Sequence, residues 1–145
     1  MKVKVYEGGY LPERAHFDDA GIDLFTPEGF TLAPHGGSKV IDLLVSVQIP
    51  IGYFGKLESK SGLNVKKNIQ TTGGVIDSGF RGTIKVRVTN NGDEAYVFDR
   101  GDKITQMVLV PVGLNDIVEV DKLDPSESGR DASGWGSTGK RGRNE

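Results

Sequence analysis

Short apolar runs alternate with turn-forming residues along most of the chain. Glycine, proline and asparagine gather at positions such as Pro34, Pro50 and Asn90, and the segments between them are too short for typical helices. Residues 84–88 (IKVRV) alternate apolar and polar, as expected for a strand with one buried face. The pattern predicts strands within residues 3–6, 22–25, 40–49, 53–57, 84–88, 95–98, 104–110 and 117–120.

These closely spaced runs predict an all-β domain, either a sandwich or a barrel. Only residues 61–67 are compatible with a turn or two of helix. After residue 123 the sequence becomes polar and rich in Gly, Ser and Pro, which is typical of a flexible tail. We therefore expect a β domain over residues 1–123 and a tail over residues 124–145.

Composition narrows the functional classes. The chain has 145 residues and a formal charge of −2. It therefore has no overall positive charge, and stable binding to nucleic acid is not expected. It has no cysteine, which excludes thiolate chemistry, and no long apolar run that predicts a membrane span or a signal peptide. His16 and His35 lack partners at metal-ligand spacing, so both are expected at the surface. A cytoplasmic protein is the expectation, and the modest 36 % of hydrophobic residues favours an oligomer.

Residues 73–82 (GGVIDSGFRG) carry the strongest chemical signal. Paired glycines allow the backbone to approach a ligand closely, because no Cβ stands in the way. Val75 and Ile76 would anchor the segment in the core, and Asp77 follows at once, as a rigidly held general base requires. The alternative is an ordinary β-turn with a surface aspartate, since Asp and Gly are common in turns.

Three other segments place polar groups beside apolar strand residues. Asp23 lies between Ile22 and Leu24, which is unfavourable unless the carboxylate meets a cation or hydrogen-bond donors. Residues 59–63 (SKSGL) combine a cation, hydroxyls and a glycine, a set suited to an oxyanion. Gln106 is predicted on the same strand face as Ile104. In the turn that precedes this strand, Arg100 and Asp102 are expected to form an ion pair with each other.

The tail contains the only tryptophan, Trp135, without apolar neighbours. Either it fills a gap in the domain's own core or it covers a flat ligand. Arg130, Ser137 and Thr138 lie nearby, with several glycines between them. A cation, hydroxyls and open backbone N–H groups suit a phosphate.

Five segments in order resemble the five motifs of the trimeric dUTP diphosphatases (dUTPases): AGIDL, SKSGL, GGVIDSGFRG, RGDKITQM and RDASGWGSTG, spanning residues 20–139. The resemblance implies a β jelly-roll homotrimer with active sites shared between subunits. It also implies Mg²⁺-dependent hydrolysis of dUTP to dUMP and pyrophosphate by water attack on the α-phosphorus. Such an activity limits uracil incorporation into DNA and supplies dUMP for dTMP synthesis.

The resemblance assigns the hairpin around residue 77 to the nucleoside. Asp77 is the base that activates water, and Phe80 packs on the deoxyribose so that a 2′-hydroxyl does not fit. The uracil edge is read by the hairpin backbone, with the binding residues Thr72, Gly73, Gly74 and Ile76.

The remaining motifs are assigned to the phosphates, the metal and the closing tail. Asp23 would hold Mg²⁺ through water. Trp135 would stack on the uracil when the tail closes. The phosphate-binding residues would be Lys60, Ser61, Gly62, Gln106, Arg130, Gly136, Ser137 and Thr138.

Three positions depart from the family pattern. Lys60 replaces a usual arginine, which turns a bidentate phosphate contact into a point charge. Phe80 replaces a usual tyrosine, and Trp135 replaces a usual phenylalanine.

Two alternatives remain. dCTP deaminases share the fold but need a glutamate on the strand where Arg87 lies. A non-enzymatic nucleotide-sensing protein with a regulatory partner would use the same scaffold.

Overall fold

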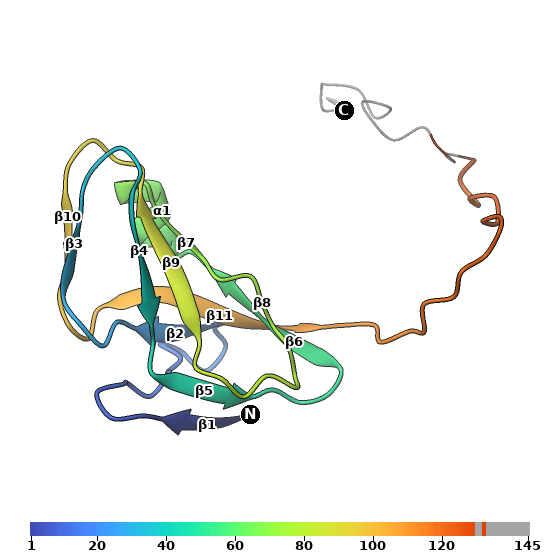
Figure 1. Cartoon of the computed structure of the whole chain (residues 1–145), viewed down its shortest axis with the longest axis horizontal. Helices are drawn as coiled ribbons and strands as arrows, with labels where there is room; N and C mark the ends of the chain where they lie inside the picture. Colours follow the sequence, from blue (N-terminus) through green and yellow to red (C-terminus); the bar gives the residue numbers. More distant parts are fainter. Residues whose placement is uncertain (130–131, 133–145) are drawn as a thin grey trace. The chain divides into compact units, whose positions relative to one another are not determined.

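The computed structural model describes residues 1–129 and 132. Within them the chain forms eleven strands and one short helix, in agreement with an all-β prediction (Figure 1). The elements are β1 (Lys2–Val5), β2 (Gly21–Phe25), β3 (Phe30–Leu32), β4 (Gly37–Asp42), β5 (Val45–Gln48), β6 (Tyr53–Glu58), α1 (Ser61–Lys67), β7 (Ile69–Thr72), β8 (Val75–Ile76), β9 (Lys85–Asn90), β10 (Tyr96–Phe98) and β11 (Lys103–Pro111).

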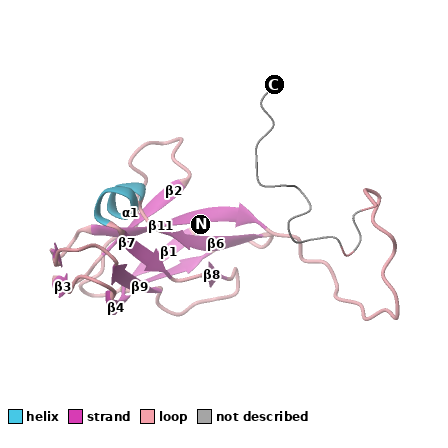
Figure 2. Ribbon diagram, turned by 90° about the horizontal axis from the view of Figure 1, so that it is seen from above, coloured by secondary structure: helices cyan, strands magenta, loops and turns pink. Residues whose placement is uncertain are grey.

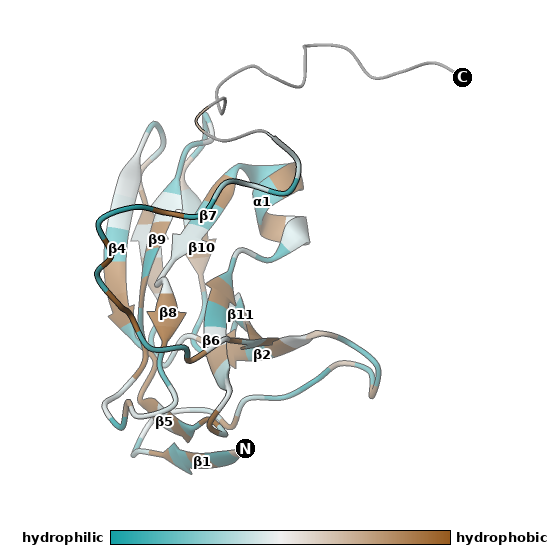
Figure 3. Cartoon of the chain, turned by 90° about the vertical axis from the view of Figure 1, so that its right-hand side faces the viewer, coloured by the Kyte–Doolittle hydropathy of each residue, from teal (hydrophilic) through white to brown (hydrophobic). Residues whose placement is uncertain are grey.

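All strand pairs are antiparallel. The larger sheets have the orders β2-β11-β6-β8 and β4-β9-β7, and the smaller ones are the ribbons β1-β5 and β10-β3. Figure 2 shows the strands of the two larger sheets in magenta, with the helix near one end. Helix α1 and the β1-β5 ribbon lie at opposite ends of the strand body (Figures 1 and 3).

Alternating side chains of these strands build one apolar core. In β9, Val86 and Val88 are buried while Lys85 and Arg87 are exposed, as the sequence pattern predicts. Met107 from β11 and Ile41 from β4 belong to the same buried cluster. Burying such side chains stabilises the fold by roughly 1.5–3 kcal/mol each. This rigid core fixes the strand ends from which the polar residues of the motifs project.

The predicted short helix is confirmed as α1. Asn68 ends it in a left-handed conformation, with φ 53°, and its N–H donates to the Asn64 carbonyl at 2.9 Å. Lys66 and Lys67 occupy the last turn, where a positive charge is favourable. No residue of α1 is fully buried, although Leu63 packs partly against the core, and the helix connects β6 to β7.

The strand predictions need three corrections. The run 40–49 is two strands, because Leu44 turns the chain with φ 55° and its N–H donates to the Asp42 carboxylate at 3.0 Å. The strand predicted within residues 117–120 is wrong: no strand forms there and Ile117 is fully exposed. The short strands β3, β7 and β8, of three, four and two residues, were not predicted.

Contacts divide the chain into two units, Met1–Leu114 and Asn115–Glu145. The functional boundary expected after residue 123 stays a prediction. His16 and His35 are exposed, as expected. No helix in the described residues is long and apolar enough to span a membrane.

Candidate active site

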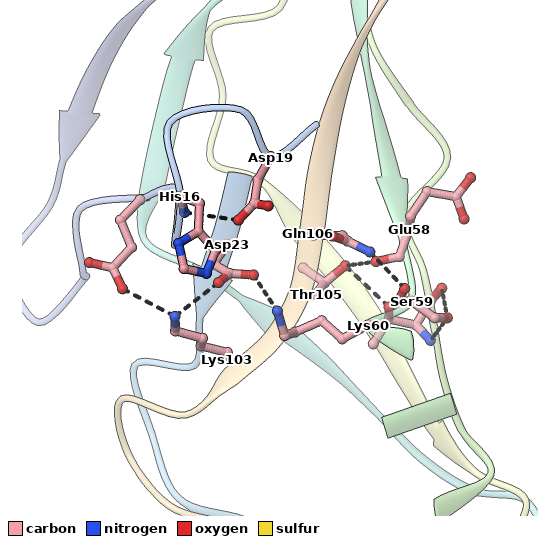
Figure 4. Close-up of polar contacts among 11 residues, drawn as sticks. His16, Asp19, Asp23, Glu58, Ser59, Lys60, Lys103, Thr105 and Gln106 are labelled. Atoms are coloured by element: carbon pink, nitrogen blue, oxygen red, sulfur yellow. Dashed lines mark hydrogen bonds and ion pairs between the residues drawn. The ribbon is translucent and has the colours of Figure 1, made fainter. Parts of the chain in front are cut away.

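Asp23 is the centre of a buried charge cluster. It lies in β2 opposite Gln106 of β11, and the whole residue is only 5 % exposed. One carboxylate oxygen accepts a hydrogen bond from the Lys60 ammonium, and the other lies 2.9 Å from the Lys103 Nζ (Figure 4). The sequence predicted that a buried Asp23 needs a cationic partner, and the structure shows two, Lys60 and Lys103.

A second carboxylate completes the cluster. The Lys103 Nζ is 3.3 Å from Glu13 Oε1, and the Glu13 backbone forms an isolated bridge with that of Asp23. Burial raises the pKa of Asp23, but hydrogen bonds and charge from both lysines outweigh it, so the pKa lies below its usual value. Hydrogen bonds to Asp23 and Glu13 raise the pKa of Lys103. Asp23 and Lys103 are consequently both charged near neutral pH.

Gln106 joins this cluster from the neighbouring strand. Its Nε2 donates to the Ser59 carbonyl at 3.1 Å, directly before Lys60 (Figure 4). Gly21 leaves the space that the Gln106 amide occupies, since a Cβ there would collide with it. The prediction that Gln106 shares a face with Ile104 is wrong. A register shift between Lys103 and Thr105 adds one residue, so Ile104 and Thr105 are both buried.

The hairpin from β7 to β8 is positioned by backbone contacts. Gly74 has φ 70°, a conformation that favours glycine, and its carbonyl accepts a hydrogen bond from Leu57 N–H at 3.1 Å. Gly73 packs on Leu57 without room for a Cβ, and Ile76 is buried, as expected for an anchor. The same expectation for Val75 is wrong, because its side chain lies on the other face of β8 and the residue is 58 % exposed. A cleft of about 440 Å³ opens here, lined by Gly73, Ile76, Phe80, Gly82, Thr83 and Lys85.

Asp77 begins the tight turn that follows the hairpin. Its carbonyl accepts the Phe80 N–H at 3.1 Å, which closes the turn over residues 77–80. Asp77 is exposed, and among the described residues no side-chain hydrogen bond or ion pair engages its carboxylate. Phe80 is 41 % exposed and faces the cleft. Thus the turn presents an unpaired carboxylate beside an aromatic ring.

The structure therefore groups the predicted residues into two clusters within one chain. Asp23, Lys60 and Gln106 form the charge cluster, with Ser61 and Gly62 at the start of α1 beside it. Ile76, the residue before Asp77, lies opposite Gly55, whereas Gln106 lies opposite Glu58. These two positions are three residue steps apart along β6, which is about 10 Å at about 3.4 Å per residue. Asp77 and Gln106 of one chain therefore do not converge on one atom.

Two further predictions can be compared with the structure. The expected pair between Arg100 and Asp102 is wrong: the Asp102 carboxylate accepts the Asp99 N–H at 2.8 Å, and Arg100 lies over the Tyr10 ring. Arg87 lies on β9 opposite Thr72, exposed and 3.3 Å from the Ser38 hydroxyl. The tail residues Arg130, Trp135, Gly136, Ser137 and Thr138 lie outside the described residues.

Sequence reasoning missed Lys103 and Glu13 as members of the charge cluster. Lys103 lies within the fourth motif, but the pattern gave no signal that it reaches Asp23. Glu13 precedes the first motif by several residues, and only the backbone bridge brings it there.

The polar residues fit a magnesium ion that is shared with a substrate. The described residues contain no cluster of three or more His, Asp or Glu side chains that could form a metal cage. Mg²⁺ usually keeps several waters and needs only one or two carboxylates besides substrate phosphates. A carboxylate has about four acceptor positions, so the two lysines on Asp23 leave room for a metal-bound water.

Comparisons with known proteins agree with these motifs. The dUTPase family profile matches residues 8–139. The deoxyuridine 5′-triphosphate nucleotidohydrolase of Candida albicans is 37 % identical over 97 % of this chain and 89 % of its own length.

Two solved structures are also similar. A mutant dUTPase of Staphylococcus bacteriophage 80alpha with dUpNHpp has a TM-score of 0.86 and 30 % identity, over 96 % of this chain and 98 % of that one. A mutant dUTPase of phage phi11 of S. aureus, which coordinates a structural Mg(II) ion, has a TM-score of 0.76 and 30 % identity, over 83 % and 96 %. Because the family profile covers nearly the whole chain and the five motifs are present in order, this protein belongs to the dUTPase family.

Proposed function

We propose that this chain is a dUTP diphosphatase that hydrolyses dUTP to dUMP and pyrophosphate. The observation that carries the proposal is the unpaired Asp77 carboxylate in a tight turn beside the cleft of Phe80, Gly73 and Ile76. Membership of the dUTPase family adds the substrate. By this activity the enzyme limits uracil in DNA and supplies dUMP for dTMP synthesis. A cytoplasmic location belongs to the same proposal.

Asp77 activates the water that attacks the α-phosphorus. Its exposed carboxylate has an acceptor free for that water, and the turn closed by the Phe80 N–H limits its motion. A positioned base contributes roughly 10²–10⁴-fold to the rate. The rest of the catalysis is positioning and neutralisation of phosphate charge, as is usual for phosphoryl transfer.

The hairpin selects the nucleoside. Backbone groups of Thr72, Gly73 and Gly74 read the uracil edge, since the glycines allow close approach. The Phe80 ring packs against the deoxyribose and leaves no room for a 2′-hydroxyl. Because Phe80 has no phenol, this discrimination is steric.

The charge cluster receives the phosphates. Lys60 is part of a pair with Asp23 and is still a quarter exposed, so an incoming phosphate can share its ammonium. Ser61, Gly62 and Gln106 contribute further donors next to it. Mg²⁺, held through water by Asp23, would neutralise phosphate charge and polarise the phosphoryl oxygens. The phi11 dUTPase with its structural Mg(II) supports this cofactor.

The complete site is shared between copies in a homotrimer with the jelly-roll fold. Asp77 and Gln106 must address the same phosphate, and about 10 Å of strand lies between their positions in one chain. A neighbouring copy can bring its own hairpin to the charge cluster. Tyr53 of β6 and Val75 of β8 are exposed on the four-stranded sheet. Such exposed apolar side chains support burial of this surface against another copy.

The tail closes the site. Arg130, Ser137 and Thr138 bind the γ-phosphate, and Trp135 stacks on the uracil beside Gly136. These roles come from the family motif alone. No observation favours a deaminase, since Arg87 occupies the strand position where a proton-carrying glutamate is needed. A regulatory protein partner stays an alternative from the sequence.

A nucleotide panel tests the proposal. The full chain is incubated with Mg²⁺ and, separately, dUTP, UTP, dTTP or dCTP, and the products are separated by anion exchange. We expect dUMP and pyrophosphate from dUTP, with slow or no turnover of the others. Ammonia released from dCTP, or equal rates with dUTP and UTP, would contradict the proposal. Light scattering of the same sample should give the mass of a trimer.

A further inference from the structure

The Arg81 side chain folds back over the turn that carries Phe80. Its Nη1 donates to two main-chain carbonyls, those of Ser78 and Phe80, each at 2.7 Å. Hydrogen bonds from a charged donor are shorter and stronger than neutral ones, and these two have the distance expected of that class. One guanidinium nitrogen thus joins both ends of the segment 78–80.

Gly82 fixes the ring of Phe80 from the other side. A Cβ added to Gly82 would lie 2.7 Å from the ring tip, Phe80 Cζ, and 3.0 Å from Cε2. The ring therefore rests directly on the Gly82 backbone, and any larger residue would push it outward. The Gly82 carbonyl is itself held by the buried Ser46 hydroxyl, which donates to it at 2.9 Å.

These contacts leave the Phe80 ring little freedom, although 41 % of the residue is exposed. The turn closed by Phe80 N–H fixes its backbone, Arg81 fixes its carbonyl, and Gly82 sets how far the ring can fold back. Rejection of the 2′-hydroxyl of UTP by shape alone depends on where the Phe80 ring lies, because only one oxygen atom of the sugar would clash with the ring.

We propose that Arg81 is a positioning residue for sugar specificity, which acts by holding Phe80 against Gly82. The inference rests on the proposed function, since it concerns the step at which dUTP is preferred to UTP. Both hydrogen bonds of Arg81 go to main-chain carbonyls of the turn, so its proposed action is on the turn and not on the base. Removing it should therefore weaken the choice of sugar and leave the choice of base unchanged.

The test measures two ratios of kcat/KM in the full chain: dUTP over UTP for the sugar, and dUTP over dCTP for the base. Arg81→Met keeps most of the alkyl chain and removes both hydrogen bonds. We expect its sugar ratio to fall on the order of three- to tenfold, because the side chain is exposed and the ring is loosened rather than lost. Arg81→Lys keeps a charged donor and should recover part of the ratio.

Gly82→Ala is the second variant. It keeps Arg81 and displaces the ring directly, so its sugar ratio should fall in the same direction, again with the base ratio unchanged. The matched control is Arg14→Met, which removes another exposed guanidinium that donates to a main-chain carbonyl, that of Asp19. Both ratios of this control should equal those of the unmodified chain.

The outcomes separate the two proposals. If the sugar ratio survives Arg81→Met, or if both ratios fall in parallel, the positioning role is overturned and Arg81 only stabilises the turn. If the unmodified chain itself does not prefer dUTP to UTP, the proposed function fails together with this inference. A fall of the sugar ratio alone, in both Arg81→Met and Gly82→Ala, supports the positioning role.

Discussion

The charge cluster and the hairpin of residues 72–82 are built on different physical principles. Asp23 is buried and held by side-chain charges, with two lysines on its two oxygens. Asp77 is exposed and held by its backbone, through glycines and a turn hydrogen bond. The cluster has its charged partners within the chain, and under the proposed function it shares them with a phosphate. The Asp77 carboxylate has no side-chain partner among the described residues.

This difference shows where each region should be sensitive. Changes in the cluster should affect stability as well as binding, because they leave a buried charge with fewer partners. Changes in the exposed turn should affect turnover with little effect on folding.

The largest effect is expected for Asp77→Asn. An amide cannot take the proton from water, so kcat should fall roughly 10²–10⁴-fold. The affinity for a non-hydrolysable dUTP analogue, measured by calorimetry, and the thermal midpoint should both stay near those of the unmodified chain. Near-normal turnover would reject Asp77 as the base.

Mixed oligomers sharpen the comparison between the two regions. Asp77→Asn damages the hairpin and Lys60→Met damages the cluster, so each variant alone should be nearly inactive. If one site combines regions of two copies, co-refolded mixtures should regain about a quarter of full activity, because random pairing reunites two intact halves in that share of sites. Lack of recovery in mixtures that refold to the same mass as the unmodified protein would show that each chain forms its own site.

A stability effect is expected for Asp23→Asn. At neutral pH it should lower the free energy of unfolding by roughly 1–3 kcal/mol, since a buried carboxylate with two charged partners is replaced by a neutral amide. The folded-state pKa of Asp23 lies below its usual 3.8, so its contribution is present above that value and is lost as pH falls through the folded-state pKa.

Urea unfolding of both proteins from pH 7 downward checks this sign. The difference in unfolding free energy should be constant from pH 7 to about 5 and should shrink below about pH 4. A difference that grows on acidification would contradict the assigned ion pairs.

The smallest effect is expected for Lys39→Met. Lys39 pairs with Glu28 at 2.9 Å, but both side chains are about half exposed. An exposed pair of this kind contributes about 0–1 kcal/mol, and salt screens it. Urea unfolding should therefore give a change of that size at low salt and less at high salt. A loss as large as that of Asp23→Asn would mean that exposure does not separate the two kinds of ion pair.

The all-β fold class, the family and the polar motifs could be predicted from the residue pattern alone. Alternation in residues 84–88 is a local signal, because successive side chains in a strand point to opposite faces. The need for a cation at Asp23 also followed from the sequence, because a carboxylate between two core residues is unstable alone. Helix α1 was predictable as a short interruption between strands.

Which of these polar groups come into contact could not be predicted from the residue pattern, because it depends on the three-dimensional fold. That Lys103 and Glu13 reach Asp23 depends on strand pairing between distant segments, as does the bulge that buries both Ile104 and Thr105. The break at Leu44 depends on a side-chain-to-backbone bond that apolar patterning does not reveal. The contact of Phe80 with Gly82 likewise depends on how the turn folds back on itself, and so do the two hydrogen bonds that Arg81 donates to the same turn. A sequence records each residue's chemistry, whereas such contacts depend on relative positions that the whole core must fix.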